Sequence, residues 1–199
     1  MIDLPPRTRA VLRELAEAGA AHDAATERRE EKCLNLEWPT AEALYLAVRL
    51  AKRRRVLEIG TSNGFSAIWL ASALESLGAG ELISIERNPE KRAEARANLD
   101  KAGLAGRVTL FQGEATPLVA ALEGVFDCVF FDADRVSAPE QLALLMPRLT
   151  PDALLLADNA LSHPGEIAGY LAAVEASGEF DTTILPVGKG LHVAVRRSA

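Results

Sequence analysis

The sequence predicts an α/β protein with a doubly wound sheet of seven strands, six parallel and the last antiparallel. From residue 55 onward, short apolar runs alternate with helical segments, a pattern typical of parallel strands joined by right-handed crossovers. Near the C-terminus, two further runs are separated only by residues 188–190. So short a connection must form a hairpin, which makes the last strand antiparallel to its neighbour.

Two helices are expected before the first strand. Residues 7–32 have an apolar stripe and a charged end, which predicts an amphipathic helix. Because the stripe is modest, this helix has three possible packing partners: the body of the protein, a partner subunit, or a site that it covers as a lid. A second helix is predicted to begin at the Pro-Thr pair of residues 39–40. We therefore expect one domain over residues 1–199, with residues 1–36 as an N-terminal helical arm.

The remaining elements alternate along the chain. The helix that starts at Asn88-Pro89-Glu90 has a capping residue, a first-turn proline and an acid that suits the helix dipole. We expect strands at 55–59, 82–86, 108–112, 127–131 and 153–157, helices at 64–78, 88–103, 115–123, 138–149 and 164–176, and hairpin strands at 180–187 and 191–197.

Composition excludes several classes of protein. With 49% hydrophobic and 25% charged residues, the chain is neither disordered nor a disulfide scaffold. Its net charge of -6 argues against general binding to nucleic acid or anionic membranes. Cys33 and Cys128 match no metal or redox spacing. The N-terminus has no apolar leader and no segment has the length of a membrane span, so we expect a cytoplasmic protein.

Acidic residues gather where the predicted strands end. Ligands of open α/β sheets bind beyond the carboxyl ends of the strands. Each of the first five strands carries an acid at or directly after that end. These acids are Glu58, Glu86, Glu114, the pair Asp132 and Asp134, and Asp158.

The first loop, GTSNG at residues 60–64, indicates a nucleoside ligand. It lacks both the dinucleotide glycine spacing and the Lys-Ser/Thr of a triphosphate loop. Glu86, 28 residues beyond Glu58, suits two ribose hydroxyls, and the surrounding acids favour a cationic ligand. These features together indicate S-adenosylmethionine. The alternative is a tight turn beside a solvated strand end.

The segments VLEIGTSNGFSAIWLA, ISIERNPEKRAEARANL, QGEA, FDCVFFDAD and LLLADNAL resemble the class I methyltransferases. More narrowly, they are similar to the cation-dependent O-methyltransferases of the catechol and caffeoyl-CoA type, over residues 37–197. The resemblance implies the Rossmann-like methyltransferase fold and a homodimer formed through the first helix or the final hairpin. It also implies a cofactor site that contains Glu58, Gly60, Thr61, Ser66, Glu86, Glu114, Ala115 and Asp132.

The same resemblance implies that Asp132, Asp158 and Asn159 are metal ligands. Two carboxylates and an amide oxygen form a hard donor set that suits Mg²⁺, Ca²⁺ or Mn²⁺. Adjacent parallel strands lie about 4.8 Å apart, so groups at their ends can meet at one ion. The alternatives are a turn at Asp158-Asn159 and a helix cap at Asp132. We favour the metal, because both alternatives would have to hold independently.

The chain departs from the family at Arg135, where the family usually has a lysine that acts as general base. Arginine stays protonated, so Arg135 cannot remove a proton, although it can stabilise a phenolate or pair with a substrate carboxylate. The proton then goes to Asp134 or water, the metal alone supplies enough acidity, or activity is weak. We assign catalytic roles to Asp132 and Arg135.

The predicted activity is methyl transfer from S-adenosylmethionine to a small catechol-like or other vicinal-oxygen acceptor, dependent on a divalent cation. Two alternatives stay open. One is a methyltransferase for hydroxylated uridine in tRNA, to which the Arg run at 53–55 could contribute positive charge. The other is a protein that binds S-adenosylmethionine with weak or lost catalysis. We expect no membrane partner.

Overall fold

A computed structural model describes residues 2–28 and 31–198, and within them a seven-stranded sheet has the order β3-β2-β1-β4-β5-β7-β6. Neighbouring strands pair in parallel except β7, which is antiparallel to both β5 and β6. The predicted architecture is confirmed. The strands are β1 (Arg55–Ile59), β2 (Glu81–Glu86), β3 (Val108–Gln112), β4 (Phe126–Phe131), β5 (Leu149–Ala157), β6 (Phe180–Leu185) and β7 (Leu191–Arg196).

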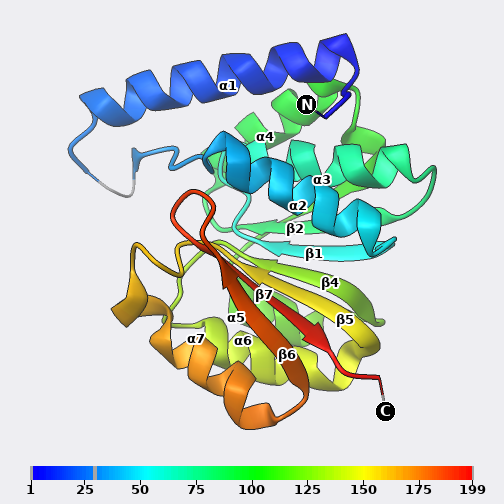
Figure 1. Cartoon of the computed structure of the whole chain (residues 1–199). Helices are drawn as coiled ribbons and strands as arrows, with labels where there is room; N and C mark the ends of the chain where they lie inside the picture. The colour runs from blue at the N-terminus through cyan, green and yellow to red at the C-terminus, as the bar shows by residue number, and fades with distance from the viewer. Residues whose placement is uncertain (1, 29–30, 199) are drawn as a thin grey trace.

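Helices cover both faces of the sheet (Figure 1). One face packs against α1 to α4 and the other against α5 to α7, so each face has its own apolar core. The helices are α1 (Pro6–Ala25), α2 (Trp38–Leu50), α3 (Phe65–Ser76), α4 (Pro89–Ala102), α5 (Ala115–Ala121), α6 (Ala138–Leu145) and α7 (Pro164–Ser177), with 3₁₀ turns η2 (Ala105–Arg107) and η3 (Met146–Arg148).

The helix ends follow local chemistry. The Asn88 side chain accepts hydrogen bonds from the backbone N–H groups of Glu90 and Lys91, which caps α4 as predicted. Gly103, with φ +77°, ends that helix in the left-handed conformation. The expected helix 138–149 is wrong in its last turn. There Pro147 lies within η3, and β5 begins at once with Leu149.

The expected helix 7–32 is too long, since α1 ends at Ala25. Thr26 takes an extended conformation, and its hydroxyl donates to the carbonyl of His22 at 2.7 Å. The carboxylate of Asp23 accepts hydrogen bonds from the backbone of Cys33 and Leu34, which turns the chain back along the helix end. Residues 29 and 30 of the expected helix lie outside the described part of the chain.

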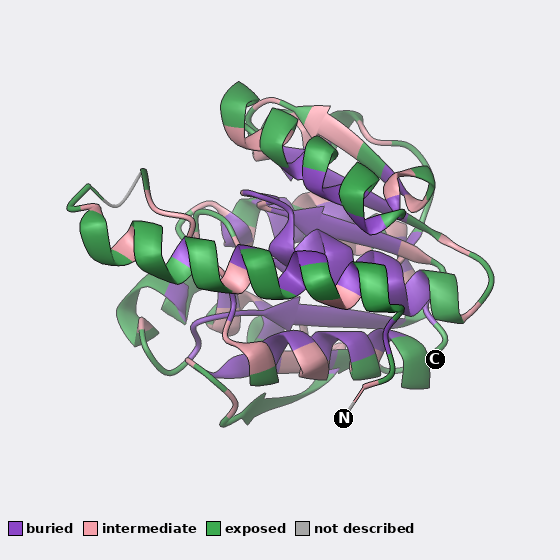
Figure 2. Ribbon diagram, turned by 90° about the horizontal axis from the view of Figure 1, so that it is seen from above, coloured by how far each residue is buried: buried purple, intermediate pink, exposed green. Residues whose placement is uncertain are grey.

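α1 packs on the body of its own chain, the first of the three options that its stripe allowed. Val11, Leu12 and Leu15 are buried in the core shared with α3, while much of the helix surface is exposed (Figure 2). At its start, Arg7 donates to the carbonyl oxygens of Asp100 and Lys101 at the end of α4. No helix of the described residues is long and apolar enough to cross a membrane.

Candidate functional site

The parallel strands end at one edge of the sheet, here called the carboxyl edge, and the loop after β1 runs along it. Gly60 in that loop has φ +104°, a conformation that favours glycine. A Cβ atom at Gly60 would lie 2.5 Å from the carbonyl oxygen of Asp132. Because that neighbour is backbone, the loop approaches the end of β4 as closely as a glycine allows.

A chain of polar side chains crosses from β1 to β2 under this loop. The hydroxyls of Thr61 and Ser84 lie 2.5 Å apart, and Ser84 donates to Oε2 of Glu58 at 2.5 Å. Burial raises the pKa of Glu58 to about 7, against the hydrogen bonds from Ser66 and Ser84. Oε1 of Glu58 is buried and has no hydrogen-bond partner among the described residues. The network holds a carboxyl group directly beneath the loop, with one oxygen available to a ligand.

Glu86, the last residue of β2, is buried, so the alternative of a solvated strand end is wrong. Its Oε2 accepts from the backbone N–H of Ser62, and its Oε1 accepts from that of Asn88, both at 2.8 Å. A carboxylate has about four lone-pair sites, so each oxygen can still accept a hydroxyl group. Glu86 therefore shapes the first loop and keeps the capacity to hold a ribose.

Glu114 and Ala115, which the resemblance places in the cofactor site, lie just after the end of β3, beside β2. The N–H of Gly113, at the end of β3, donates to the carbonyl of Glu86 at 3.0 Å. Glu114 follows as the exposed N-cap residue of α5, and Ala115 is half-buried in its first turn. Ser66, by contrast, is buried in the first turn of α3, next to Glu58. All the predicted cofactor residues thus lie along the first three strand ends and the end of β4.

Asp132 and Asp158 follow neighbouring strands, since Phe131 pairs in register with Ala157. Burial and the nearby carboxylate of Asp158 raise the pKa of Asp132 well above its usual range, although Arg135 and Lys189 oppose this. Burial raises the pKa of Asp158 to about 6. Two carboxyl groups close together, Asp158 buried and Asp132 half-buried, therefore lie at the carboxyl edge.

Asn159 completes this group. With φ +67°, it takes the left-handed conformation that asparagine tolerates. Its Nδ2 donates to Oδ2 of Asp158 at 2.6 Å, and its Oδ1 accepts from Ser162 at 3.1 Å. Oδ1 of Asp158 is buried and has no hydrogen-bond partner in the described chain.

The donor set fits a hard divalent cation. Asp132, Asp158 and Asn159 supply oxygen ligands, the class that Mg²⁺ and Ca²⁺ take. Burial raises both carboxyl pKa values, and like charges add to it, from Asp158 and Glu58 at Asp132 and from Glu37 at Asp158. A cation would offset these effects, and it would bind the unpartnered oxygen of Asp158. A turn at Asp158-Asn159 or a helix cap at Asp132 would explain neither the raised pKa values nor the unpartnered oxygen of Asp158.

Arg135 lies beside this group and is already paired. Its Nη1 lies 2.7 Å from Oε2 of Glu166, in the first turn of α7. Asp134 accepts hydrogen bonds from the Ser137 hydroxyl and the Val136 N–H, and these lower its pKa. Such a carboxylate is a poor proton acceptor, so the structure favours water over Asp134 in that role.

One acid near the site was not predicted from sequence. Glu37, directly before α2, pairs with Lys189 of the final hairpin at 2.9 Å, and its charge raises the pKa of Asp158. The turn of that hairpin reaches the start of α2 (Figure 1). Lys189 is 152 residues further along the chain, so only the folded topology brings the pair together.

Comparisons with known proteins agree with this geometry. Residues 57–160 match the methyltransferase domain family. A catechol O-methyltransferase from Niastella koreensis is 35% identical over 122 residues, 59% of this chain and 54% of that protein. Another, from Mycobacterium tuberculosis, is 35% identical over 155 residues, 77% of this chain and 68% of that protein. The chain therefore spans about half of the first relative's length and about two thirds of the second's.

A solved structure agrees as well. The O-methyltransferase TomG from Streptomyces achromogenes, in complex with S-adenosylmethionine, superposes with a TM-score of 0.78 at 26% identity, covering 99% of this chain and 92% of that one. Sheet order, carboxyl-edge chemistry and relatives lead to the same family. The chain belongs to the class I S-adenosylmethionine-dependent O-methyltransferases.

Proposed function

We propose that the protein methylates one hydroxyl of a catechol-like or other vicinal-oxygen acceptor, and that it needs a divalent cation to do so. The observation that carries the proposal is the half-buried Asp132 close to the buried Asp158 and Asn159, with one carboxylate oxygen of Asp158 unpartnered in the described chain. Two catechol O-methyltransferases among the relatives support the acceptor class.

The chain's own residues bind and orient the two reactants. When bound, S-adenosylmethionine supplies an electrophilic methyl group, and a divalent cation supplies Lewis acidity toward two adjacent hydroxyl oxygens. Glu86 would accept hydrogen bonds from the ribose, and Glu58, Thr61 and the first loop would line the methionine side. Asp132, Asp158 and Asn159 would hold the cation. Alignment of this kind accounts for much of the rate in a transfer between two bound reactants.

The acceptor's proton must leave the site without a lysine base. Arg135 remains charged and cannot take it, and Asp134 is engaged by Ser137 and Val136. We assign the proton to water. Arg135 would stabilise negative charge on the acceptor oxygen through its guanidinium, which Glu166 holds in place.

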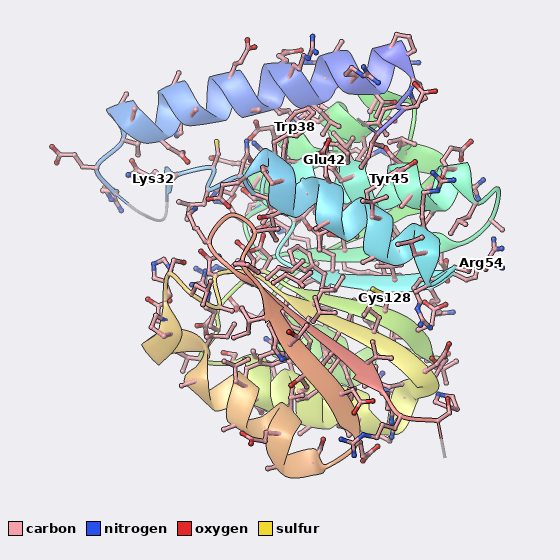
Figure 3. The ribbon with its side chains drawn as sticks, in the orientation of Figure 1. Lys32, Trp38, Glu42, Tyr45, Arg54 and Cys128 are labelled. Carbon is pink, nitrogen blue, oxygen red and sulfur yellow. The ribbon has the colours of Figure 1, made fainter. Side chains whose placement is uncertain are left out.

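The tRNA alternative gains no support from the Arg run at 53–55. Arg53 is buried and pairs with Asp152 at 2.8 Å, and Arg55 pairs with Glu81 at 3.2 Å. The run ends at Arg55, the first residue of β1, so it lies at the opposite end of that strand from the first loop, as the position of Arg54 shows (Figure 3).

The homodimer stays a prediction. The first helix and the final hairpin both stay candidate interfaces, because α1 packs on its own chain through one face only and the edge strand β6 exposes Ile184 and Leu185. Light scattering on the purified protein measures the oligomeric state. A monomeric mass at every concentration would contradict this prediction.

The proposed reaction is tested with labelled S-adenosylmethionine and a catechol, with Mg²⁺ or with excess chelator. We expect turnover only with the metal, and none on a phenol that has a single hydroxyl. Asp158→Asn should abolish turnover yet still bind S-adenosylmethionine. Asp181→Asn, the same change at an exposed residue of β6, is the matched control. Full turnover in chelator would exclude cation dependence.

A further inference from the structure

Three metal-binding side chains of different types converge at the end of α1, away from the carboxylates of the proposed reaction site. A ring nitrogen of His22, a carboxylate oxygen of Asp23 and the thiol sulfur of Cys33 lie within 4.8 Å of one another. Sequence spacing gave no sign of this group, because the segment after α1 turns back and returns Cys33 to the helix that it has just left.

Backbone contacts hold the group together without any help from the thiol. Asp23 accepts from the N–H of Cys33 at 2.7 Å and from that of Leu34 at 2.9 Å. One residue further on, Nδ2 of Asn35 donates to the carbonyl of Leu15 at 2.9 Å. The segment is therefore fixed on the last turns of α1, and the positions of Asp23 and Cys33 are set before any ion binds.

The distances and the charges both suit a cation. Ligands around a tetrahedral ion with sulfur at about 2.3 Å and nitrogen at about 2.0 Å lie roughly 3.5 Å apart. Reaching that spacing needs a side-chain movement of about 1 Å, which the exposed His22 can supply. The carboxylates of Asp23 and Glu94 place negative charge near Cys33. A bound cation would favour the thiolate, because a coordinating thiol is deprotonated.

We propose that His22, Asp23 and Cys33 form a second metal site, selective for a thiophilic divalent ion such as Zn²⁺, with solvent as the fourth ligand. Nitrogen, carboxylate and thiolate are donors that zinc takes in proteins, whereas Mg²⁺ prefers oxygen alone. The two sites therefore differ in the ions that they select. This site does not depend on the proposed methyl-transfer reaction.

The site lies where it can influence cofactor binding. The carbonyl of Cys33 accepts from the hydroxyl of Ser62, in the loop after β1, at 3.0 Å. Next to it, the carbonyl of Lys32 accepts from Nζ of Lys91 in α4 at 2.7 Å, and Lys32 lies in the segment that passes beneath the end of α1 (Figure 3). An ion at this site would fasten α1 to the segment that touches the cofactor loop. Zn²⁺ should therefore raise the affinity for S-adenosylmethionine.

Cobalt titration of the full chain, reduced and saturated with Mg²⁺, tests the site. Co²⁺ bound to a thiolate gives a charge-transfer band in the near ultraviolet, and Zn²⁺ should displace the Co²⁺ and remove the band. We expect Cys33→Ala to lose the band and His22→Gln to weaken Co²⁺ binding at least tenfold. Cys128→Ala, at the buried cysteine of β4, is the matched control and should keep the band.

Three outcomes would overturn the proposal. These are the absence of a charge-transfer band in the parent protein, a band that persists in Cys33→Ala, and Co²⁺ affinity unchanged in His22→Gln. Should Cys33→Ala fail to fold by circular dichroism, His22→Gln decides the matter, because His22 is exposed and its loss leaves the Asp23 contacts intact. None of the three outcomes bears on Mg²⁺-dependent turnover, which uses other residues.

Discussion

Nη1 of Arg135 lies 2.7 Å from Oε2 of Glu166, so an ion pair joins the turn after β4 to the first turn of α7. The Arg135 side chain is only 15% exposed, and its charge lowers the pKa of both Asp132 and Asp158. Arg135, three positions after the proposed metal ligand Asp132, is therefore a fixed positive charge beside the site. We expect its part in the proposed reaction to be electrostatic.

The first prediction concerns the turnover rate of a variant that lacks the positive charge of Arg135. Arg135→Ala should lower kcat by up to about 10²–10³-fold, the cost of removing one group that stabilises developing negative charge. Its removal also raises the pKa of Asp132 and Asp158, which should move the acidic limb of the pH-rate profile to higher pH. Glu166→Gln, which keeps the guanidinium, should not move the limb upward. An unchanged kcat together with an unmoved acidic limb in Arg135→Ala would contradict this account.

The second prediction concerns Glu58 and the free energy of unfolding. Burial raises the pKa of this carboxyl from 4.5 to about 7, so the folded state holds the proton more tightly than the unfolded state. The stabilisation is fully present below pH 4.5 and is lost as the pH rises through about 7. At one pKa unit per 1.36 kcal/mol, the loss for the cofactor-free protein amounts to about 3 kcal/mol.

Urea denaturation between about pH 4.5 and pH 8 measures this effect. The parent protein should become less stable as the pH rises, whereas Glu58→Gln should show a much shallower slope. The slope that remains combines Asp132 and Asp158, whose pKa values are raised in the same direction, with His192. Burial lowers the pKa of His192 to about 4, so its contribution has the opposite sign. Equal slopes in the parent and in Glu58→Gln would refute the assignment.

Elements with a strong local signal could be predicted from the sequence. The expected bounds of β1 and β3 match the structure at both ends, because each apolar run is bounded by polar or turn residues. Gly188-Lys189-Gly190 predicted the antiparallel β7 for the same reason, since so short a connection allows only a hairpin. The acids at the carboxyl edge followed from topology, because parallel strands end on one side.

Features that depend on distant partners could not be predicted. The end of α1 at Ala25 is set by Asp23, which accepts from backbone N–H groups that lie ten and eleven residues further along. Arg135 meets Glu166, and Glu37 meets Lys189, only after the strands have been ordered. No periodic pattern in the sequence predicts such pairs. They are also the contacts that surround the proposed metal ligands, so the details of the site needed the structure.

The third prediction compares two glycines. Both Gly60 (φ +104°) and Gly78 (φ +71°) have a backbone conformation that disfavours other residues, but only Gly60 has backbone of Asp132 against it. A Cβ atom at Gly78 would meet nothing within 4 Å. Gly78→Ala should therefore cost about 1–2 kcal/mol of unfolding free energy from its conformation alone and keep its affinity for S-adenosylmethionine.

Gly60→Ala should be less stable than Gly78→Ala, and it should bind S-adenosylmethionine at least tenfold more weakly, because the loop must move away from Asp132. Urea denaturation and calorimetric titration with the cofactor measure the two effects. Equal stability and equal affinity in the two variants would show that the close approach at Gly60 is unimportant.

The fourth prediction links Mg²⁺, pH and stability. A ligand that binds only the folded state stabilises it by about 2.7 kcal/mol at 100 times its Kd. Asp158 must be ionised to coordinate, and its pKa is raised to about 6, so protons compete with the metal below that pH. The increase in Tm on adding Mg²⁺ should thus be large at about pH 7.5 and small at about pH 5.5. Asp158→Asn should show little increase at either pH, whereas Asp181→Asn should behave as the parent. An increase in Tm that is independent of pH, or that persists in Asp158→Asn, would show that Mg²⁺ binds away from Asp158. Asp181→Asn makes the same change at an exposed residue, so it controls for the loss of one carboxylate.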